Sequence, residues 1–448
     1  MAAGEGRAAV STLGPLLLLL LLALAVLASC SDRPEPRRNL ILISMDTLRA
    51  DRLGAYGYLR PTSPNIDALA ARGARFARAY SSAPWTLPAH ATIFTGLTPQ
   101  RHDTHGWLQK LPETVPTLAE LLQQAGWRTY AHTTGGFVGG RYGFARGFEE
   151  YIDELGGFKM TRAAARRQIE SWPRDESYFL FLQTFTVHCP YPASRAHREA
   201  FRTQSGLDDV GAPSNCLVKP LKSNFSEAEK IFLSDRYDAA IRTADDKLAE
   251  FIRFLDERGA FEDTYLVLLS DHGDEFGDHG SIFHGHTLYE ELLRVPLVIV
   301  GPGIEPGVVE ERVGLVDLMP TLLDLLGVEK TGGEGRSLVG HLLGEFSGAE
   351  PSGETPYFAS TDEGVKLRGV ISGNYKLVLD LETDRVRLFD LEKDPAERHD
   401  LADQEPAARD RLRLLLDSHL ERASLGAGQE AALSEEEIEE LRALGYAR

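Results

Sequence analysis

Carboxylate and imidazole side chains follow two apolar runs of the sequence. Asp46 comes directly after the run 39–45, and Asp271 and His272 come directly after the run 265–270. Both residue types bind divalent cations, and the imidazole suits Zn²⁺ or Mn²⁺ better than Ca²⁺ or Mg²⁺. Asp46 alone would be read as a strand-end or turn residue, and a lone Asp-His pair is a weak signal. Together the three residues predict a site for one divalent metal ion.

A second chemical feature is the stretch APWTLPAHATIFTG at residues 83–96. Pro88 is tolerated in a first helical turn, so a helix is predicted with Thr86 at or just before its N-terminus. That end of a helix favours an anion such as a phosphate or sulfate ester. His90 follows four residues later, on the same helical face, and is a candidate substrate-binding residue. On local sequence alone, a helix-capping Thr86 and a core His90 explain the stretch equally well.

Elements that would position these residues alternate along the chain. Mostly apolar runs predict buried strands at 39–45, 178–185, 265–270 and 295–300. Amphipathic helices are predicted at 117–125, 227–258 and 318–326, the last with Asp317 as its cap. This alternation indicates an α/β fold with a mostly parallel sheet flanked by helices. Ligands of such sheets bind at the carboxyl ends of the strands, where Asp46, His188, Asp271 and His272 are all expected.

The character of the sequence changes after about Pro351. Short alternating runs at 365–372, 375–381 and 385–391 are joined by turns and predict a smaller antiparallel sheet. Helices are predicted at 405–425 and 434–444. We therefore expect an α/β catalytic domain at 39–350, an antiparallel subdomain at 351–425 and a helical tail at 426–448.

The first 29 residues read as a signal peptide. A purely apolar run at 16–28 follows Arg7 and is short for a membrane-spanning helix. It leads into Leu-Ala-Ser-Cys ending at Cys30, which resembles a bacterial lipobox, so residues 30–38 are predicted to be a lipidated cysteine and a linker. This predicts a protein of the bacterial cell envelope, lipid-anchored and facing the periplasm or the exterior. An uncleaved signal anchor is the alternative.

Charge and cysteine usage narrow the function classes. The formal net charge of −19 argues against nucleic-acid binding, which needs a basic surface. Besides Cys30, the chain has only Cys189 and Cys216. A disulfide between them and two free thiols are both open. A catalytic thiol at Cys189 is disfavoured, because nothing nearby resembles a cysteine-hydrolase pattern.

Longer motifs carry a resemblance to a known family. The chain is similar to the sulfatase family, within the alkaline phosphatase superfamily, over roughly residues 38–420. Individually the motifs are weak, but their order and spacing together are specific. The matching stretches are ISMDTLRAD at 43–51, TxPxH at 86–90, FTG at 94–96, TxHxPY at 186–191, YDxxIxxxD at 237–245, SDHG at 270–273, HGxTLYEE at 284–291, RVPL at 294–297 and LFDLxxDPxE at 388–397.

The resemblance implies a role for each matching residue. It implies an alkaline-phosphatase-like fold in which Asp46, Asp271 and His272 bind the metal together with Thr86, which occupies the nucleophile position. His188 and His284 would contact the ester or protonate the leaving group.

The same resemblance says less about the roles of four further histidines. His286 would accompany His284 in binding substrate. His102, His105 and His279 lie near related positions and are expected to be structural.

The chain also departs from the sulfatase pattern. Sulfatases carry a cysteine or serine that is converted to formylglycine, whereas Thr86 has no suitable route to that aldehyde. His90 replaces the family arginine, Thr47 stands where many sulfatases have a second metal-binding aspartate, and TTGG at 133–136 replaces a Gly-Lys-Trp-His segment. A threonine is similar to the nucleophile of phosphoethanolamine transferases and nucleotide pyrophosphatases of the same superfamily.

These observations lead to one functional hypothesis and two alternatives. The chain is expected to be a metal-dependent hydrolase or transferase of phosphate or sulfate esters, with Thr86 as the metal-activated nucleophile. Its substrate would be a small-molecule, glycan or lipid ester. The alternatives are a sulfuric ester hydrolase that works without formylglycine and a non-catalytic, anion-binding relative of the sulfatases.

Overall fold

The structure is a computed structural model. It describes residues 38–153, 156–173, 175–203, 225–329, 332–345, 355–426, 428–435 and 438–439. The predicted signal peptide, Cys30 and nearly all of the linker lie outside these residues, as does most of the helix predicted at 434–444. Within the described residues, no helix combines the length and apolar character needed to cross a bilayer.

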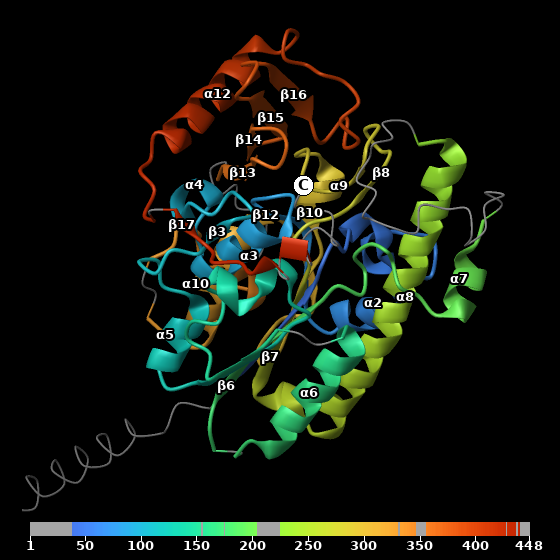
Figure 1. The fold of residues 1–448 in the computed structure, drawn as a ribbon, viewed down its shortest axis with the longest axis vertical. Coiled ribbons are helices and arrows are strands. Elements are labelled where there is room, and N and C mark those ends of the chain that lie inside the picture. The colour runs from blue at the N-terminus through green and yellow to red at the C-terminus, as the bar shows by residue number, and fades with distance from the viewer. Residues whose placement is uncertain are drawn as a thin grey trace, which may run out of the picture. The chain divides into compact units, whose positions relative to one another are not determined.

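A nine-stranded sheet forms the centre of the fold (Figure 1). Five neighbouring strands, in the order β7-β1-β6-β4-β5, run parallel to one another. Beyond β7 the sheet continues with β11, β2 and β10, and β12 also pairs with β2; only β10 and β11 oppose the common direction. The strands are β1 (Asn39–Met45), β2 (Ala74–Tyr80), β4 (Arg128–His132), β5 (Glu150–Ile152), β6 (Tyr178–Thr184), β7 (Thr264–Leu269), β10 (Arg294–Val295), β11 (Leu297–Val300) and β12 (Gly307–Gly314).

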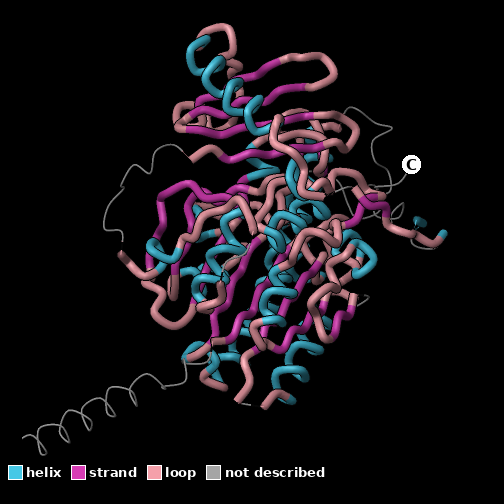
Figure 2. Tube along the Cα trace, turned by 90° about the vertical axis from the view of Figure 1, so that its left-hand side faces the viewer, coloured by secondary structure: helices cyan, strands magenta, loops and turns pink. Residues whose placement is uncertain are grey.

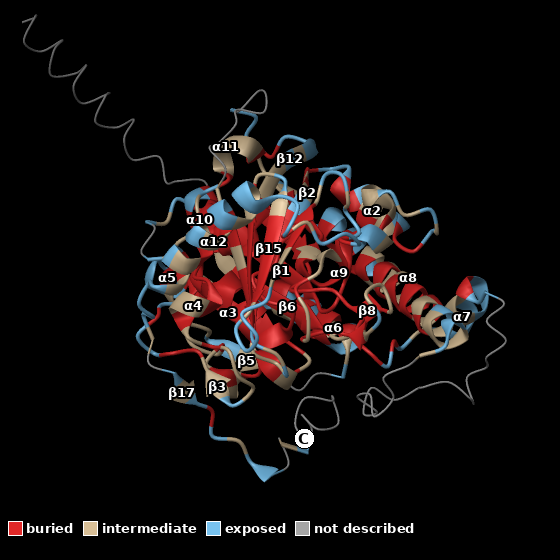
Figure 3. Cartoon of the chain, turned by 90° about the horizontal axis from the view of Figure 1, so that it is seen from above, coloured by how far each residue is buried: buried red, intermediate tan, exposed pale blue. Residues whose placement is uncertain are grey.

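Helices cover both faces of this sheet, which explains why its strands read as continuous apolar runs. Leu40 and Leu42 of β1 pack in one core and Ile41 and Ile43 in the other. Figure 3 shows the buried strands surrounded by helices with exposed outer surfaces. The first face is covered by α3 (Thr86–Thr95), α5 (Leu118–Gln124) and α10 (Leu318–Leu325), and the second by α2 (Pro64–Ala70), α6 (Phe158–Ser171) and α8 (Glu227–Glu257).

Two of the predicted helices begin with the capping residues that the sequence indicates, and a third does not. Thr117 and Ser226 cap α5 and α8 with complete capping boxes. Asp317, predicted as the cap of α10, makes no side-chain cap bond. Its carboxylate instead accepts hydrogen bonds from Gly314 N, Arg336 N and Tyr357 Oη, so it joins the helix start to neighbouring segments.

The C-terminal region forms the predicted smaller antiparallel sheet. Its strands are β13 (Tyr357–Thr361), β14 (Leu367–Ser372), β15 (Tyr375–Asp380) and β16 (Val386–Asp390), paired in that order. Helix α12 (Pro406–Leu420) packs across one face of the sheet, as Figures 1 and 2 show. The sequence predicted three of these strands and the helix; β13 was missed.

Several short helices and two-stranded ribbons lie outside the two larger sheets and their covering helices. They are α4 (Pro99–His102), α7 (Arg195–Phe201), α9 (Glu290–Leu293) and α11 (Val339–Leu342), and two ribbons that pair β3 (Gln109–Lys110) with β17 (Gln429–Glu430) and β8 (Glu275–Phe276) with β9 (Ile282–Phe283).

Polar contacts tie the C-terminal sheet to the segment that begins α9. The buried Lys376 Nζ lies 2.8 Å from Glu397 Oε1 and 3.2 Å from Glu290 Oε1. Thr361 Oγ1 donates to the carbonyl of Gly285 at 2.6 Å. The small sheet therefore fixes residues that follow His284 in the chain.

Candidate active site

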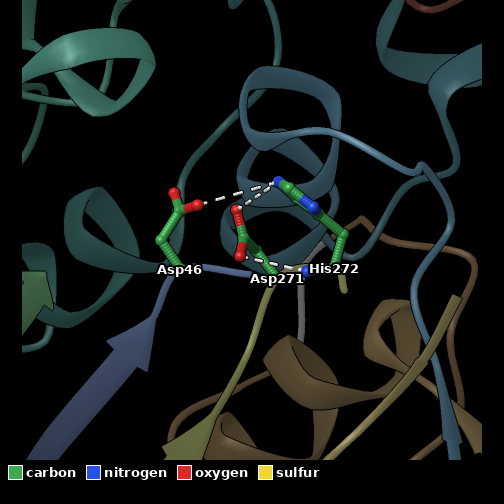
Figure 4. Close-up of side chains that lie close together, drawn as sticks. All are labelled: Asp46, Asp271 and His272. Carbon is green, nitrogen blue, oxygen red and sulfur yellow. Dashed lines mark hydrogen bonds and ion pairs between the residues drawn. The ribbon is translucent and has the colours of Figure 1, made fainter. Parts of the chain in front are cut away.

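The three predicted metal ligands meet at the carboxyl ends of β1 and β7. Asp46 directly follows β1 and donates its backbone N–H to Thr184 at the end of β6. Asp271 and His272 follow β7, the neighbouring parallel strand. One ligand atom from each of Asp46, Asp271 and His272 lies within 4.8 Å of the others, and all three side chains are fully buried (Figure 4).

The chemistry of this cluster suits a divalent cation. Asp46 Oδ1 and Asp271 Oδ2 are buried and have no hydrogen-bond partner in the described part of the chain. His272 Nδ1 donates to Gly273 O at 2.9 Å, which leaves Nε2 as the ligand atom. That Nε2 lies 3.4 Å from Asp271 Oδ2 and 3.9 Å from Asp46 Oδ1. Buried polar atoms are normally paired, so these two oxygens and the imidazole fit a metal site.

The electrostatics of the cluster lead to the same conclusion. Burial, and then the charge of Asp271, raises the pKa of Asp46 well above its usual value. Burial also raises the pKa of Asp271 and lowers that of His272 to about 4. A bound cation would favour both charged carboxylates, and a neutral imidazole is the form that ligates it.

Thr86 is the first residue of α3, and its hydroxyl faces the cluster. Oγ1 donates to Asp46 Oδ2 at 3.3 Å and lies 3.4 Å from His272 Nε2. The N-cap position belongs to Trp85, which makes no side-chain cap bond. The capping alternative for Thr86 is therefore wrong, and its hydroxyl is placed at the possible metal site.

His90 is fully buried, with protein partners on both ring nitrogens. Nδ1 donates to the carbonyl of Thr86 at 3.0 Å, and Nε2 accepts from Ser44 Oγ at 3.0 Å. Nδ1 also lies 3.4 Å from Asp271 Oδ2. The geometry thus gives His90 a supporting position behind Thr86 and Asp271, in place of the predicted contact with substrate.

His188 and His284 lie beside His272. The ring centroid of His284 is 4.6 Å from that of His272 and 5.1 Å from that of His188. His188 Nδ1 donates to Cys189 O at 2.7 Å, and burial lowers the pKa of His188 to about 4. His188 after β6, His272 after β7 and His284 after β9 thus lie side by side, and His272 contacts Thr86.

The remaining predicted histidines are bound to the protein. His286 lies with Nε2 3.0 Å from Glu275 Oε2 and Nδ1 3.2 Å from the carbonyl of His284, and 28% of its side chain is exposed. His279 stacks on Tyr289 and lies 2.7 Å from Glu291 Oε1, a structural arrangement.

Two polar residues of the site were missed by the sequence analysis. Gln183, near the end of β6, donates Nε2 to Asp46 Oδ2 at 3.5 Å, and Thr134 Oγ1 donates to its Oε1 at 2.8 Å. Asp274 Oδ1 lies 3.0 Å from His284 Nδ1, and burial raises the pKa of Asp274 to about 7. The sequence signal for Gln183 was an amide within an apolar run, and the signal for Asp274 was a carboxylate directly after the SDHG motif.

Two other residues bear on the sequence predictions. Thr47 adopts φ 61°, uncommon for a β-branched residue, and donates its backbone N–H to Asp271 Oδ1 at 3.3 Å. Its hydroxyl donates to the carbonyl of Asp46. Cys189 is disulfide-bonded, which removes it as a catalytic thiol. Cys216, the partner in the disulfide alternative that the sequence left open, lies outside the described residues.

Comparison with known proteins defines the class. The model of the family described as Sulfatase matches residues 38–328, and that described as N-sulphoglucosamine sulphohydrolase, C-terminal, matches residues 277–424. The chain therefore belongs to the sulfatase family and is an ester hydrolase with the predicted alkaline-phosphatase-like α/β fold.

Particular relatives extend over most of the chain. It is 29% identical to a choline-sulfatase of Rhizobium meliloti, over 82% of either protein, and 25% identical to a Δ4,5-hexuronate-2-O-sulfatase of Bacteroides thetaiotaomicron, over 89% of this chain and 92% of the relative. Its fold resembles a 2-O GAG sulfatase (TM-score 0.70, 22% identity, 86% of this chain and 92% of the other). It likewise resembles a phosphonate monoester hydrolase of Agrobacterium radiobacter (TM-score 0.70, 21% identity, 89% and 99%).

Proposed function

We propose that this protein cleaves phosphate esters, and by the same chemistry sulfate esters, with Thr86 as the nucleophile. The observation that carries the proposal is the position of Thr86 Oγ1, 3.3 Å from Asp46 Oδ2 and 3.4 Å from His272 Nε2. Phosphate esters are preferred because a threonine cannot mature to the formylglycine on which ordinary sulfatases depend.

We assign one divalent cation to Asp46, Asp271 and His272, with Thr86 Oγ1 as a further ligand. The imidazole favours Zn²⁺ or Mn²⁺ over Ca²⁺ or Mg²⁺. When bound, such a cation lowers the pKa of a coordinated hydroxyl and offsets developing negative charge. The partnerless oxygens of Asp46 and Asp271 support this assignment.

The protein's own groups account for the remaining chemistry. The ester's non-bridging oxygens face the first turn of α3, where N–H groups without helical acceptors and the helix dipole favour an anion. Thr86 Oγ1 loses its proton to solvent and bonds to phosphorus or sulfur as the bond to the ester oxygen breaks. His284 or His188 gives the leaving oxygen a proton. Water then attacks the phosphorylated or sulfated Thr86, the bond from Oγ1 to phosphorus or sulfur breaks, and Oγ1 regains a proton as the inorganic anion is released. An acceptor alcohol in place of water gives transfer.

The substrate class follows from the relatives and stays broad. By its name, the choline-sulfatase acts on a small-molecule sulfate, and the hexuronate-2-O-sulfatase acts on a glycan sulfate. We propose a small-molecule, glycan or lipid ester for this chain. Sulfate ester cleavage without formylglycine is the second candidate, and these relatives favour it.

The test uses the purified full-length protein. Wild type, Thr86→Ala and Thr86→Ser are assayed on aryl phosphate, phosphodiester, phosphonate and sulfate esters with each divalent metal. Thr86→Ala should lose about 10³-fold or more in kcat, while Thr86→Ser retains measurable activity. Thr92→Ser changes a buried threonine of the same helix and should be unaffected. Equal activity of Thr86→Ala and wild type would exclude Thr86 as nucleophile.

We also propose a cell-envelope location, with Cys30 as the lipidated residue. Support comes from the lipobox-like Leu-Ala-Ser-Cys sequence after an apolar run. Mass spectrometry of the membrane-extracted protein should find an acylated Cys30, and Cys30→Ser should release the protein from membranes. An N-terminus upstream of residue 30 in the mature protein would support the uncleaved signal anchor instead.

A further inference from the structure

Exposure to solvent rises from the centre of the candidate site outward. The three candidate metal ligands and Thr86 are fully buried, whereas His188 is 2% exposed and His284 is 7% exposed. The site is therefore reached from the side of these two histidines. On the proposed function, an ester whose phosphorus or sulfur lies at Thr86 has its alcohol portion on that side.

Phe185 is a half-buried aromatic residue on the same side of the site. It directly follows β6, and its chain neighbours Thr184 and Thr186 are both buried. The Phe185 ring packs edge-on against the His188 ring, with a centroid distance of 5.3 Å and an interplanar angle of 66°. A large apolar ring that stays partly in water beside a polar site is informative, because covering it would be favourable.

Packing in the core does not account for this ring. In the described part of the chain, the apolar residues that form or line the two cores beside the central sheet do not include Phe185. Phe179 and Phe181, which belong to the same apolar run, are fully buried in the first core. The Phe185 ring differs from them because it reaches the surface, where a ligand can pack against it.

Hydrogen bonds fix the main chain at Phe185 and connect it to the site. Its N–H donates to Thr134 Oγ1 at 3.2 Å, and its carbonyl accepts from His188 N at 3.0 Å. Thr134 Oγ1 donates to Gln183 Oε1 at 2.8 Å, and Gln183 Nε2 donates to Asp46 Oδ2 at 3.5 Å. The ring thus stands on a backbone that is held relative to a candidate metal ligand. A contact surface held in this way loses little entropy on binding.

We infer that Phe185 is a specificity-determining residue whose ring packs against the alcohol portion of the ester. It selects an alcohol that carries a ring with an apolar face. The inference rests on the proposed function and narrows its substrate class. An aryl group and the C–H side of a sugar ring both offer such a face, and either covers the exposed part of Phe185. A two-carbon alkyl group is too small to do so.

The preference for ring-bearing esters over a small alkyl ester tests this role. Wild type, Phe185→Ala and Phe185→Tyr are assayed on phenyl, hexose and ethyl esters of the acid that wild type cleaves. For each protein, kcat/KM on a ring-bearing ester is divided by kcat/KM on the ethyl ester. Phe185→Ala should lower this ratio about tenfold for at least one ring-bearing ester, mainly through a higher KM. Phe185→Tyr keeps the aromatic face and should stay within about threefold of wild type. The ester whose ratio falls further in Phe185→Ala identifies the aryl or the sugar ring.

Phe232→Ala is the matched control. Phe232 is also a half-buried phenylalanine, but it lies on α8, where its ring contacts Arg236. The ratio in this variant should equal that of wild type. An active wild type whose ratios are unchanged in Phe185→Ala, or fall as far in Phe185→Tyr as in Phe185→Ala, overturns the inference and leaves the proposed function standing. A wild type that cleaves no ester overturns both.

Discussion

Zn²⁺ or Mn²⁺ should raise the thermal stability of the metal-free protein. Asp46 Oδ1 and Asp271 Oδ2 are buried without hydrogen-bond partners in the described residues. Burial raises the pKa of both carboxyl groups, so the folded state disfavours their charges. A cation that binds the folded state and not the unfolded state offsets this cost.

The size of the effect follows from linkage. At a free metal concentration of about 100 times Kd, binding adds about 2.7 kcal/mol to the free energy of unfolding. A folded unit of about 400 residues has an unfolding entropy of about 0.8 kcal/mol/K near its midpoint. Their ratio predicts a rise in Tm of about 3 °C. The structure assigns this rise to Asp46, Asp271 and His272.

Differential scanning fluorimetry of chelator-treated protein measures the shift. Asp271→Asn is a close control, because an asparagine Oδ1 can still accept from Thr47 N and His272 N. The variant should lose the metal response, and its metal-free Tm should equal or exceed that of wild type, since one of two buried charges is gone. No shift with Zn²⁺, Mn²⁺, Ca²⁺ or Mg²⁺, or an equal shift in Asp271→Asn, would refute the metal site.

The same carboxyl groups set a pH dependence. A folded-state pKa above the unfolded value means that the native protein binds the proton more tightly than the unfolded chain. The stability contribution of Asp46 and Asp271 in metal-free protein therefore grows as the pH falls from 7 toward their ordinary pKa of 3.8. Saturating metal should reduce this dependence.

Three further predictions concern neighbouring residues. Gln183→Leu removes the amide that donates to Asp46 and should lower kcat about tenfold with little change in Tm; an unchanged kcat would contradict this role. Phe181→Ala opens a fully buried site and should cost about 3–5 kcal/mol in urea denaturation; a loss below about 1 kcal/mol would contradict the packing. Arg49 holds the pKa of Asp278 well below its usual value, so stability from this pair is fully present above about pH 4 and declines as the pH falls toward the lower folded-state pKa. Asp278→Asn should cost about 1 kcal/mol at pH 7 and less at pH 2, and an equal cost at both would contradict the pairing.

Local sequence patterns predicted the strands β1, β6 and β7 of the central sheet and the run that holds β10 and β11, but not β2, β5 or β12. The strand at 39–45 was predicted with the bounds that β1 has, because a strand buried on both faces leaves a continuous apolar run. The run 295–300 was predicted as one strand but is split at Pro296 into β10 and β11, which run against the common direction. Strand direction depends on pairing with distant segments, which a local pattern does not encode. β13 was missed for a similar reason, since it is a short strand paired with β14.

The candidate site divides in the same way. The sequence supplied Asp46, Asp271, His272 and Thr86 as residue types at strand ends and at a helix start. Local sequence left the function of Thr86 undecided. It predicted that His90 contacts substrate, whereas in the structure His90 forms hydrogen bonds with Ser44 and Thr86. Asp274 directly follows the SDHG motif, but only the structure shows its contact with His284.

The amino-acid order alone determined which chemistry is available and which elements carry it. Apolar runs fix the strands, proline and threonine fix the start of a helix, and carboxylates and imidazoles follow where strands end. Only the tertiary structure decided which of these groups meet. Thr47 and Asp271 are 224 residues apart, yet parallel pairing of β1 and β7 brings them into hydrogen-bond contact. The physical reason is that backbone pairing and core packing between distant segments set side-chain positions to within a few ångström, and a metal site or a proton donor depends on those positions.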